Sequence, residues 1–362
     1  SESYGTRSAK PKCEIRRKNV MDEATFKRLI ENKNRKPDPM RYKNAAVEYR
    51  RAGNSGLKLP AVCLGLWQNF GSFDNFEIMR DMIFTAFDKG IFAFDLANNY
   101  GPRGGSAEEN FGKILKENFS SHRDEMVIST KAGFPMWAGP CGRGGSRKYL
   151  TASLDASLKR LGIDYADIYY HHCPDSSTPV EETCYCLHQL VERGKALYVG
   201  ISNYNKEQTE AAVRVFKELH TPFILNQVCY NLLNRNIEED GLKAYAEQEG
   251  FGIIAYSPLA QGLLTERYAA GIPEDSRIMK SGSLKKETLT PELFAKLAKL
   301  RDVATRRGQT LPAFALSWVL KDEAVTSVII GASSSAQILE NIQVNRTFSA
   351  EELAEIEQIC KG

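Results

Sequence analysis

The feature that most constrains this chain is a regular alternation of short apolar runs with longer amphipathic stretches. The runs are rich in β-branched and aromatic residues, and we expect them to form strands. These eight predicted strands are 62–67, 91–95, 126–130, 166–170, 197–202, 223–227, 252–256 and 326–330. Because the runs are apolar at nearly every position, they fit a parallel sheet that is covered on both faces.

The stretches between the runs have the spacing of amphipathic helices. In FEIMRDMIFTAFDKG, one face carries Ile78, Met82, Ile83 and Phe87, and Gly90 can end the helix. No GxGxxG follows an early strand and no Walker sequence occurs, which argues against a dinucleotide-binding Rossmann sheet. The glycine-rich segment 139–146 lies in an irregular loop and is not typical of a phosphate cradle. We therefore predict an α/β fold, a (β/α)8 TIM barrel.

The chain before the barrel is expected to form a β-hairpin and an additional arm. VEYRR and LKLPAVC flank the turn GNSG, which predicts the hairpin. No linker divides the chain after residue 50, so we predict a basic arm over 1–43 and one barrel domain over 44–362. In the arm, Phe26, Leu29 and Ile30 have helical spacing behind an Asp22 cap, which predicts a helix packing on the barrel or on a neighbouring subunit.

Charge and composition exclude several classes of function. The first 43 residues carry thirteen Lys and Arg against six Asp and Glu, so the net charge of +3 leaves about −4 for the rest. Six acidic residues argue against a transit peptide, and the arm has no aromatic pattern or module typical of nucleic-acid binding. No apolar stretch is long enough for a membrane helix, and a cytoplasmic location is expected. The eight cysteines include no CxxC and the five histidines no HExxH, so no metal site is expected.

Polar residues follow the predicted strands, and four of them suggest carbonyl chemistry. Asp95, Lys131 and His172 come at or just after three strands, and Tyr100 lies in the loop after Asp95. In a barrel these positions open on one face. A phenol near a lysine can act as a proton donor, a carboxylate can keep the lysine charged, and an imidazole can orient a substrate oxygen. Each residue alone also has an ordinary structural role, and at most one of His171 and His172 is expected to point inward.

The sequence resembles the aldo-keto reductases over about residues 40–361. The resemblance lies in DLANNYG, ISTKAG, YYHHCPD, GISNY, AYSPLAQGLLT and IIGASSSAQILEN, in that order. Further segments, including GLWQNFG, GGSRKYL and YNLLNR, are similar to the bacterial glyceraldehyde 3-phosphate and methylglyoxal reductase branch, a neighbour of the potassium-channel β-subunits. The resemblance implies a barrel closed by the hairpin, NADP(H) bound without a Rossmann fold, and a catalytic tetrad: Asp95, Tyr100, Lys131 and His172.

The resemblance also implies the cofactor contacts. Asn203 and Gln227 would hold the nicotinamide carboxamide, with Ser202 and Gly331 beside them, and Tyr256 would stack on the ring. The pyrophosphate would lie along Ser257, Leu259, Gln261 and the loop 260–290. Adenine would meet Gln337, Glu340 and Asn341, which share a helix face by spacing and could alternatively be a solvated surface. Ser334 stands where many relatives carry arginine, so the 2′-phosphate of NADP would depend on Ser333, Arg267 and Arg277.

The expected substrate is a small carbonyl compound such as methylglyoxal or a triose phosphate. Trp67 and Trp137 are candidate pocket walls, although both could instead be core residues. A substrate phosphate or carboxylate could meet Arg103, Arg143 or Arg147. Two alternatives stay open, a redox-sensing binding protein like the channel β-subunits and a barrel that has lost catalysis. Relatives of this kind assemble, so a homo-oligomer, a tetramer or larger, is expected.

Overall fold

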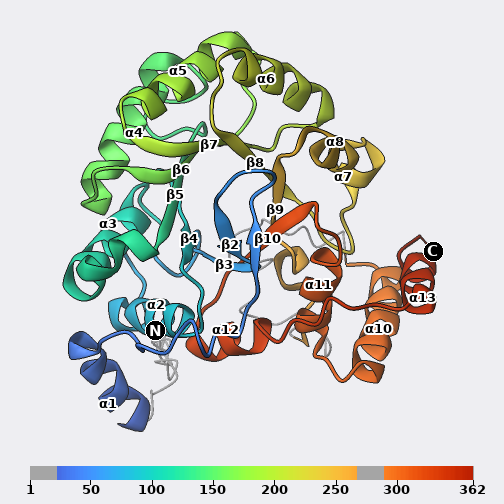
Figure 1. Cartoon of the computed structure of the whole chain (residues 1–362). Helices are drawn as coiled ribbons and strands as arrows, with labels where there is room; N and C mark the ends of the chain where they lie inside the picture. Colours follow the sequence, from blue (N-terminus) through green and yellow to red (C-terminus); the bar gives the residue numbers. More distant parts are fainter. Residues whose placement is uncertain (1–22, 267–288, 362) are drawn as a thin grey trace, which may run out of the picture.

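The computed structural model of the chain describes residues 23–266 and 289–361, and its centre is a closed barrel of eight parallel strands (Figure 1). Strand order follows the chain, and β10 closes the barrel on β3 through the pairing of Val328 with Val62. The strands are β3 (Val62–Gly65), β4 (Ala93–Asp95), β5 (Val127–Ala132), β6 (Ala166–His171), β7 (Ala196–Ser202), β8 (Phe223–Cys229), β9 (Gly252–Tyr256) and β10 (Val325–Ile330). The predicted barrel and all eight predicted strands are confirmed.

Helices surround the barrel as an outer ring (Figure 1). In α2, Asn75 caps the first turn, and Met82, Ile83 and Phe87 are buried as predicted. The ring contains α2 (Phe76–Asp88), α3 (Ser106–Ile114), α4 (Arg147–Leu161), α5 (Val180–Glu192), α6 (Lys206–Glu218), α7 (Asn236–Glu239), α8 (Leu242–Glu249), α10 (Pro291–Arg306), α11 (Leu311–Val319), α12 (Ser335–Asn341) and α13 (Ala350–Lys361). Short turns η2 (Leu115–Phe119), η3 (Ser120–Glu125) and η4 (Ala260–Gly262) complete it. None of the helices described is long and apolar enough to cross a membrane.

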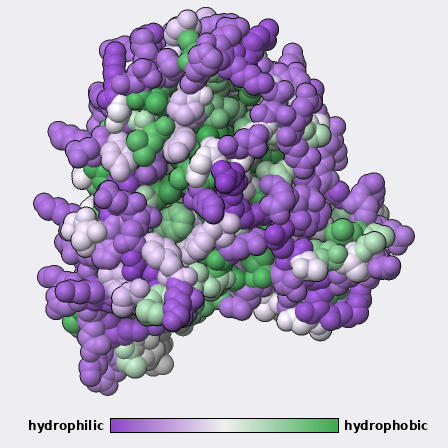
Figure 2. Space-filling model, in the orientation of Figure 1, coloured by the Kyte–Doolittle hydropathy of each residue, from purple (hydrophilic) through white to green (hydrophobic). Residues whose placement is uncertain are grey.

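The predicted hairpin is present and closes one end of the barrel. β1 (Tyr49–Arg51) and β2 (Lys58–Pro60) pair antiparallel, and Leu59 is buried against the barrel interior. A Cβ atom on Gly53, whose φ is +55°, would lie 2.3 Å from the Gly250 carbonyl oxygen, so the turn requires glycine there. Figure 2 shows this end of the molecule, with apolar side chains around the hairpin and hydrophilic side chains over the outer helices.

The described part of the arm is a helix with one buried apolar residue. α1 (Glu23–Glu31) and the turn η1 (Asn32–Asn34) lie beside α2. Leu29 is buried, whereas Phe26 and Ile30 are 58% and 57% exposed. Packing of these two side chains on a neighbouring subunit, the second option from the sequence, stays a prediction. Polar contacts from Arg28 and Asn32 to Asp81 on α2 hold the helix in place. The spacing of apolar residues in the sequence does not reveal such contacts. The predicted Asp22 cap lies outside the described residues.

Candidate active site

Three of the four predicted catalytic side chains meet at the buried ammonium of Lys131. Its Nζ donates to Asp95 Oδ2 at 2.6 Å, to the Leu96 carbonyl at 2.6 Å and to the Tyr100 hydroxyl at 3.1 Å. A lysine ammonium has three protons to donate, and each has an acceptor here. The parallel register places Asp95 at the end of β4 and Lys131 near the end of the adjacent β5, which is why the two side chains meet.

The loop that carries Tyr100 is fixed at its far end by a buried carboxylate. Glu108, in the first turn of α3, accepts a hydrogen bond from Thr130 Oγ1 at 2.5 Å and from Arg160 Nε at 2.7 Å. Thr130 precedes Lys131 on β5 and points to the opposite face of the strand. The helix after the Tyr100 loop is therefore attached to the strand that carries Lys131.

Asp95 is held by neutral donors as well as by Lys131. Its Oδ1 accepts from Ser129 Oγ at 2.8 Å and from Gln227 Nε2 at 3.0 Å. Sequence reasoning missed Ser129 and predicted only a cofactor role for Gln227. The available signal was spacing, because Ser129 lies two residues before Lys131 on the same strand and so faces the same side.

The electrostatics keep the lysine charged and the phenol protonated. Burial opposes the ammonium, but the Asp95 carboxylate and the Tyr100 hydroxyl raise the pKa of Lys131 above its ordinary value. Burial also raises the pKa of Tyr100, and the Lys131 charge lowers it by less than burial raises it. Lys131 thus lowers the pKa of Tyr100, as expected, but burial leaves the net pKa above its ordinary value. A protonated phenol is the form that a proton donor requires.

His172 lies beside Tyr100, and its neighbour His171 points elsewhere. The two rings of His172 and Tyr100 are edge-on with centroids 5.9 Å apart, and Phe134 covers His172 at 4.6 Å. Burial and the Lys131 charge hold the pKa of His172 well below its usual range, so its imidazole is neutral and can donate one hydrogen bond. His171 Nδ1 instead contacts the Tyr204 hydroxyl at 2.6 Å, which confirms that only one of the pair faces the site.

The predicted nicotinamide residues form a connected rim on β7, β8 and β9. Tyr256 donates from its hydroxyl to Asn203 Oδ1 at 2.7 Å, and Asn203 Nδ2 donates to the His172 carbonyl at 2.9 Å. Ser202 Oγ donates to the Gln227 carbonyl at 2.8 Å. Since Gln227 also contacts Asp95, the rim is continuous with the tetrad residues. Gly331, after β10, is exposed at the next strand end.

The predicted pyrophosphate segment has an unusual backbone and an unsatisfied acceptor. Ser257, Ala260 and Gln261 have φ values of 49°, 48° and 58°, in the left-handed region that non-glycine residues rarely adopt. Within the described chain, Gln261 Oε1 is buried without a hydrogen-bond partner. Strained backbone and orphaned polar atoms cluster at ligand sites, so this segment fits a polar ligand such as a dinucleotide. Leu259 is half-buried and packs on the core.

The predicted adenine residues do not form one exposed surface. Gln337 and Glu340 are exposed, and Gln337 Oε1 accepts from the Ser333 amide at 2.8 Å. Asn341 is buried, so its side chain does not share the solvent face that the spacing suggested. Arg267 and Arg277, predicted near the 2′-phosphate, lie outside the described residues.

Aromatic side chains flank the Tyr100 side of the site. Trp67 and Trp137 are 48% and 46% exposed, which rules out the alternative that they are core residues. The Trp67 ring is 6.4 Å from the Tyr100 ring, whereas Trp137 packs on Tyr149 at 5.2 Å. Trp67 is therefore the one in ring contact with the proposed proton donor.

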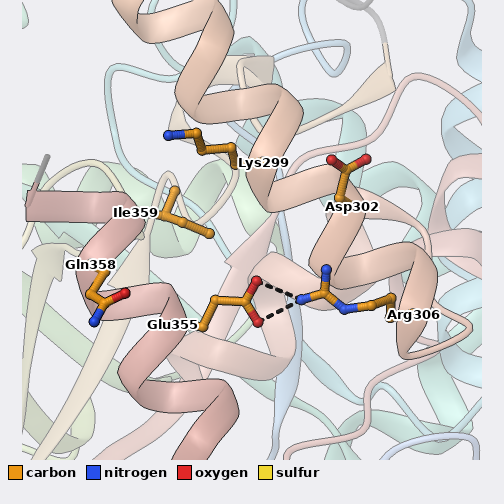
Figure 3. A pocket seen from close by; sticks show the side chains of 6 residues that line it. All are labelled: Lys299, Asp302, Arg306, Glu355, Gln358 and Ile359. Atoms are coloured by element: carbon orange, nitrogen blue, oxygen red, sulfur yellow. Dashed lines mark hydrogen bonds and ion pairs between the residues drawn. The ribbon is translucent and has the colours of Figure 1, made fainter.

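A hollow elsewhere on the molecule has no part in this chemistry. It measures about 290 Å³ and lies between α10 and α13 (Figure 3). Its charged lining includes the ion pair of Arg306 with Glu355, and no strand-end residue reaches it. Across residues 23–266 and 289–361, no group of His, Cys, Asp and Glu side chains is arranged to hold a metal ion.

Comparison with known proteins gives a consistent result. The profile of the Aldo/keto reductase family matches residues 61–361. Two relatives called L-glyceraldehyde 3-phosphate reductase, from Escherichia coli O157:H7 and strain K12, are 53% and 52% identical over 328 residues, covering 89% of this chain and 94% of theirs. A relative from Arabidopsis thaliana, named "Probable voltage-gated potassium channel subunit beta", is 36% identical over 307 residues, covering 82% of this chain and 90% of its own.

Proposed function

The chain belongs to the aldo/keto reductase family, whose members generally use NADH or NADPH, and we propose that it reduces small aldehydes and ketones with NADPH. Methylglyoxal and glyceraldehyde 3-phosphate are the substrates that we propose first. One observation carries the proposal of a catalytic tetrad: the buried Lys131 ammonium binds Asp95 and the Tyr100 hydroxyl at the same time. The relatives at 52–53% identity are called L-glyceraldehyde 3-phosphate reductase, which supports the choice of a three-carbon aldehyde.

In the proposed mechanism, Tyr100 gives its proton to the carbonyl oxygen of the substrate. A nicotinamide held by Asn203, Gln227 and Tyr256 would supply the hydride for the carbonyl carbon. Lys131, kept charged by Asp95, stabilises the phenolate as it forms, since an opposite charge in contact favours the ionised form. His172, which is neutral, donates a hydrogen bond that orients the carbonyl oxygen beside the phenol.

The cofactor would lie across the rim from β7 to β10. Asn203 and Gln227 would bind the carboxamide, Tyr256 would stack on the ring, and Gln261 would contact the pyrophosphate. We propose NADPH over NADH although Ser334 carries no positive charge for a 2′-phosphate. The choice between the two cofactors therefore needs a test of its own. Measured Michaelis constants for the two cofactors test it, and a lower value for NADH would contradict NADPH as the cofactor.

Replacing Tyr100 with Phe tests the proposed reaction. The variant keeps the ring that packs against Trp67 and His172 but loses the donated proton. We expect kcat for methylglyoxal to fall by about 10²- to 10⁴-fold, with the dissociation constant for NADPH unchanged. Unchanged kcat would contradict the role of Tyr100. A wild-type protein that binds NADPH but turns over none of a panel of small aldehydes would favour the redox-sensing binding protein instead.

A further inference from the structure

We propose that Arg143 binds the phosphate group of a phosphorylated aldehyde, which makes the loop 133–146 an anion subsite beside the tetrad. This inference rests on the proposed function and assigns the phosphate half of the substrate. Three arginines on the loops of this face were candidates from the sequence, and the structure distinguishes them by their partners.

The loop that carries Arg143 is fixed against His172. The amide of Gly144 donates to the Gly133 carbonyl at 2.8 Å, which brings the end of the loop back to its beginning. A Cβ atom on Gly133 would lie 3.1 Å from both the Cβ and the backbone nitrogen of His172. Arg143 therefore directly precedes Gly144, which is hydrogen-bonded to Gly133, and Gly133 packs against His172.

The other edge of the same loop touches the Tyr100 loop. Met136 donates from its amide to the Gly142 carbonyl at 2.9 Å, which forms a narrow hairpin directly before Arg143. The Met136 sulfur is 2.9 Å from the position of a Cβ atom on Gly104, four residues after Tyr100. The loop thus lies between the segments that carry the proposed proton donor and the proposed orienting imidazole.

The Arg143 guanidinium is available for an anion. Its side chain is exposed, and it makes neither an ion pair nor a hydrogen bond within the described ranges. The nearby carboxylate of Asp175 is already occupied by Ser177 Oγ at 2.5 Å, Thr178 Oγ1 at 2.7 Å and the Gly145 amide at 2.8 Å. The Arg143 charge also acts on Cys173, the residue after His172. Burial raises the pKa of the Cys173 thiol, and the Arg143 charge opposes that rise.

The other two candidate arginines are engaged. Arg103 pairs with Glu109 on α3, and Arg147, in the first turn of α4, donates to Gln189 on α5. A phosphate would have to displace those partners. A guanidinium without a partner can instead offer two parallel N–H groups to a phosphate, the geometry for which arginine is suited.

The test compares two substrates that differ only in the phosphate, glyceraldehyde 3-phosphate and glyceraldehyde. In Arg143→Gln, we expect kcat/KM for glyceraldehyde 3-phosphate to fall by about 10- to 100-fold, the effect of losing a charge-assisted hydrogen bond. The value for glyceraldehyde should change by less than about twofold. Arg147→Gln is the matched control, because it removes the same charge at an engaged position in the first turn of α4, four residues after Arg143, and it should leave the ratio of the two values as in wild type.

A second measurement uses inorganic phosphate as the probe. Phosphate should inhibit glyceraldehyde reduction competitively in the wild type, and the inhibition constant should rise by about tenfold in Arg143→Gln. An equal loss on both substrates would overturn the inference, because it would mean that Arg143 only shapes the loop. A wild type that reduces glyceraldehyde without preferring the phosphorylated form would also overturn the subsite while leaving the proposed carbonyl reduction intact. Failure of the wild type on glyceraldehyde, glyceraldehyde 3-phosphate and methylglyoxal alike would instead remove the proposed function itself.

Discussion

The two oxygens of the Asp95 carboxylate have different partners, and this division suggests how the lysine is positioned. Oδ2 accepts from Lys131, whereas Oδ1 accepts from Ser129 and Gln227. Ser129 and Lys131 lie on the same strand, two residues apart, so β5 alone contacts both oxygens. We infer that Ser129 is a positioning residue that orients Asp95 toward Lys131, without touching the substrate.

Ser129→Ala should therefore slow the reaction without weakening cofactor binding. Losing one hydrogen bond to a charged acceptor is worth about 1.5–3 kcal/mol, and a fraction of this should reach kcat as a reduction of about 5- to 30-fold. Ser129→Thr keeps the hydroxyl and should recover most of the rate. Steady-state kinetics measure kcat, and fluorescence titration measures the dissociation constant for NADPH. If alanine and threonine reduced kcat equally, packing around the strand would be the cause and the positioning role would be wrong.

Because His171 is buried and neutral, the stability of the fold should depend on pH through this residue. Burial lowers its pKa from the ordinary 6.5 to about 4. In the unfolded chain the imidazole takes up a proton below pH 6.5, but in the folded protein it does so only near pH 4. The stability from this residue is thus present above pH 6.5 and is lost as the pH falls toward 4, by roughly 3 kcal/mol in total.

His171→Asn should flatten this part of the profile. The free energy of unfolding, measured by urea denaturation between pH 4 and 7, should fall less steeply with acid in the variant than in the wild type. The wild type is more stable near pH 7, because asparagine does not reproduce the hydrogen bond to Tyr204. His220→Asn is the control, since His220 is exposed and its φ of 53° suits asparagine. Parallel profiles for wild type and His171→Asn would contradict the prediction.

For single residues, the sequence predicts which polar side chains follow strands better than it predicts the hydrogen-bond and ion-pair partners of those side chains. Asp95, Lys131 and His172 could be found because strand ends of a barrel face one side. Ser129 was missed although its spacing from Lys131 places both side chains on the same face of β5, because spacing alone does not show that a serine meets a carboxylate on the next strand. The engaged state of Arg103 and the free state of Arg143 depend on which carboxylates lie near in space, which single-sequence reasoning does not give. The tetrad and cofactor roles themselves stay predictions.

At the scale of elements, Asp81 on α2 joins three helices that are far apart in the chain. This buried carboxylate accepts from Arg28 on α1 at 3.2 Å, from Asn32 at 2.8 Å and from Ser335 at the start of α12. A buried charge is tolerated only with partners, so the arm helix is part of the charge balance of α2. The arm therefore contributes to the barrel mainly through polar contacts.

Deleting residues 1–35 should destabilise the protein, while deleting residues 1–22 should leave the Asp81 contacts intact. We expect the longer deletion to lower the free energy of unfolding by about 2–3 kcal/mol more than the shorter one, because it leaves Asp81 with fewer donors. Asp81→Asn should then cost less in the truncated chain than in the full chain, and this coupling can be measured by a double-mutant cycle. Equal stability of the two deletions would show that α1 is not attached in this way.

The periodicity of apolar residues predicted the strands and the hairpin well, but it did not predict which side chains contact neighbouring elements. All eight strands were found because each is a short apolar run, and the hairpin because its turn is rich in glycine. The π-helical turn η2, by contrast, could not be predicted, because its sequence LKENF shows no pattern that distinguishes it from an α-helix. In α1 the spacing of Phe26, Leu29 and Ile30 is truly helical, but the pattern cannot tell which of these side chains meets a neighbour.

For the whole molecule, the two ends of the barrel have separate tasks. The carboxyl ends of the strands carry the candidate site, and the hairpin closes the opposite end. Arg50 on β1 is buried there and donates to the carbonyls of Leu320 and Asp322 at 3.1 and 2.7 Å, with Glu323 as ion-pair partner at 3.2 Å. It thus attaches the start of the domain to the segment that leads into β10, the strand that closes the barrel on β3.

This separation predicts that a variant at the hairpin end loses stability but keeps its catalytic constants. Arg50→Met retains the apolar stem and removes both backbone hydrogen bonds, which should lower the free energy of unfolding by about 2–4 kcal/mol. At 25 °C, kcat and KM should stay within about twofold of wild type, because residues at this end of such barrels serve stability. Arg51→Met, on the same strand, is the matched control. The Arg51 side chain is exposed and, among the described residues, donates only to the Ser55 carbonyl in the hairpin turn, so the free energy of unfolding should change by less than about 0.5 kcal/mol. Ser129→Ala should differ from Arg50→Met in lowering kcat. If Arg50→Met instead reduced kcat while the protein stayed folded, the hairpin and the site would be coupled through the barrel, and the two ends could not be treated as independent.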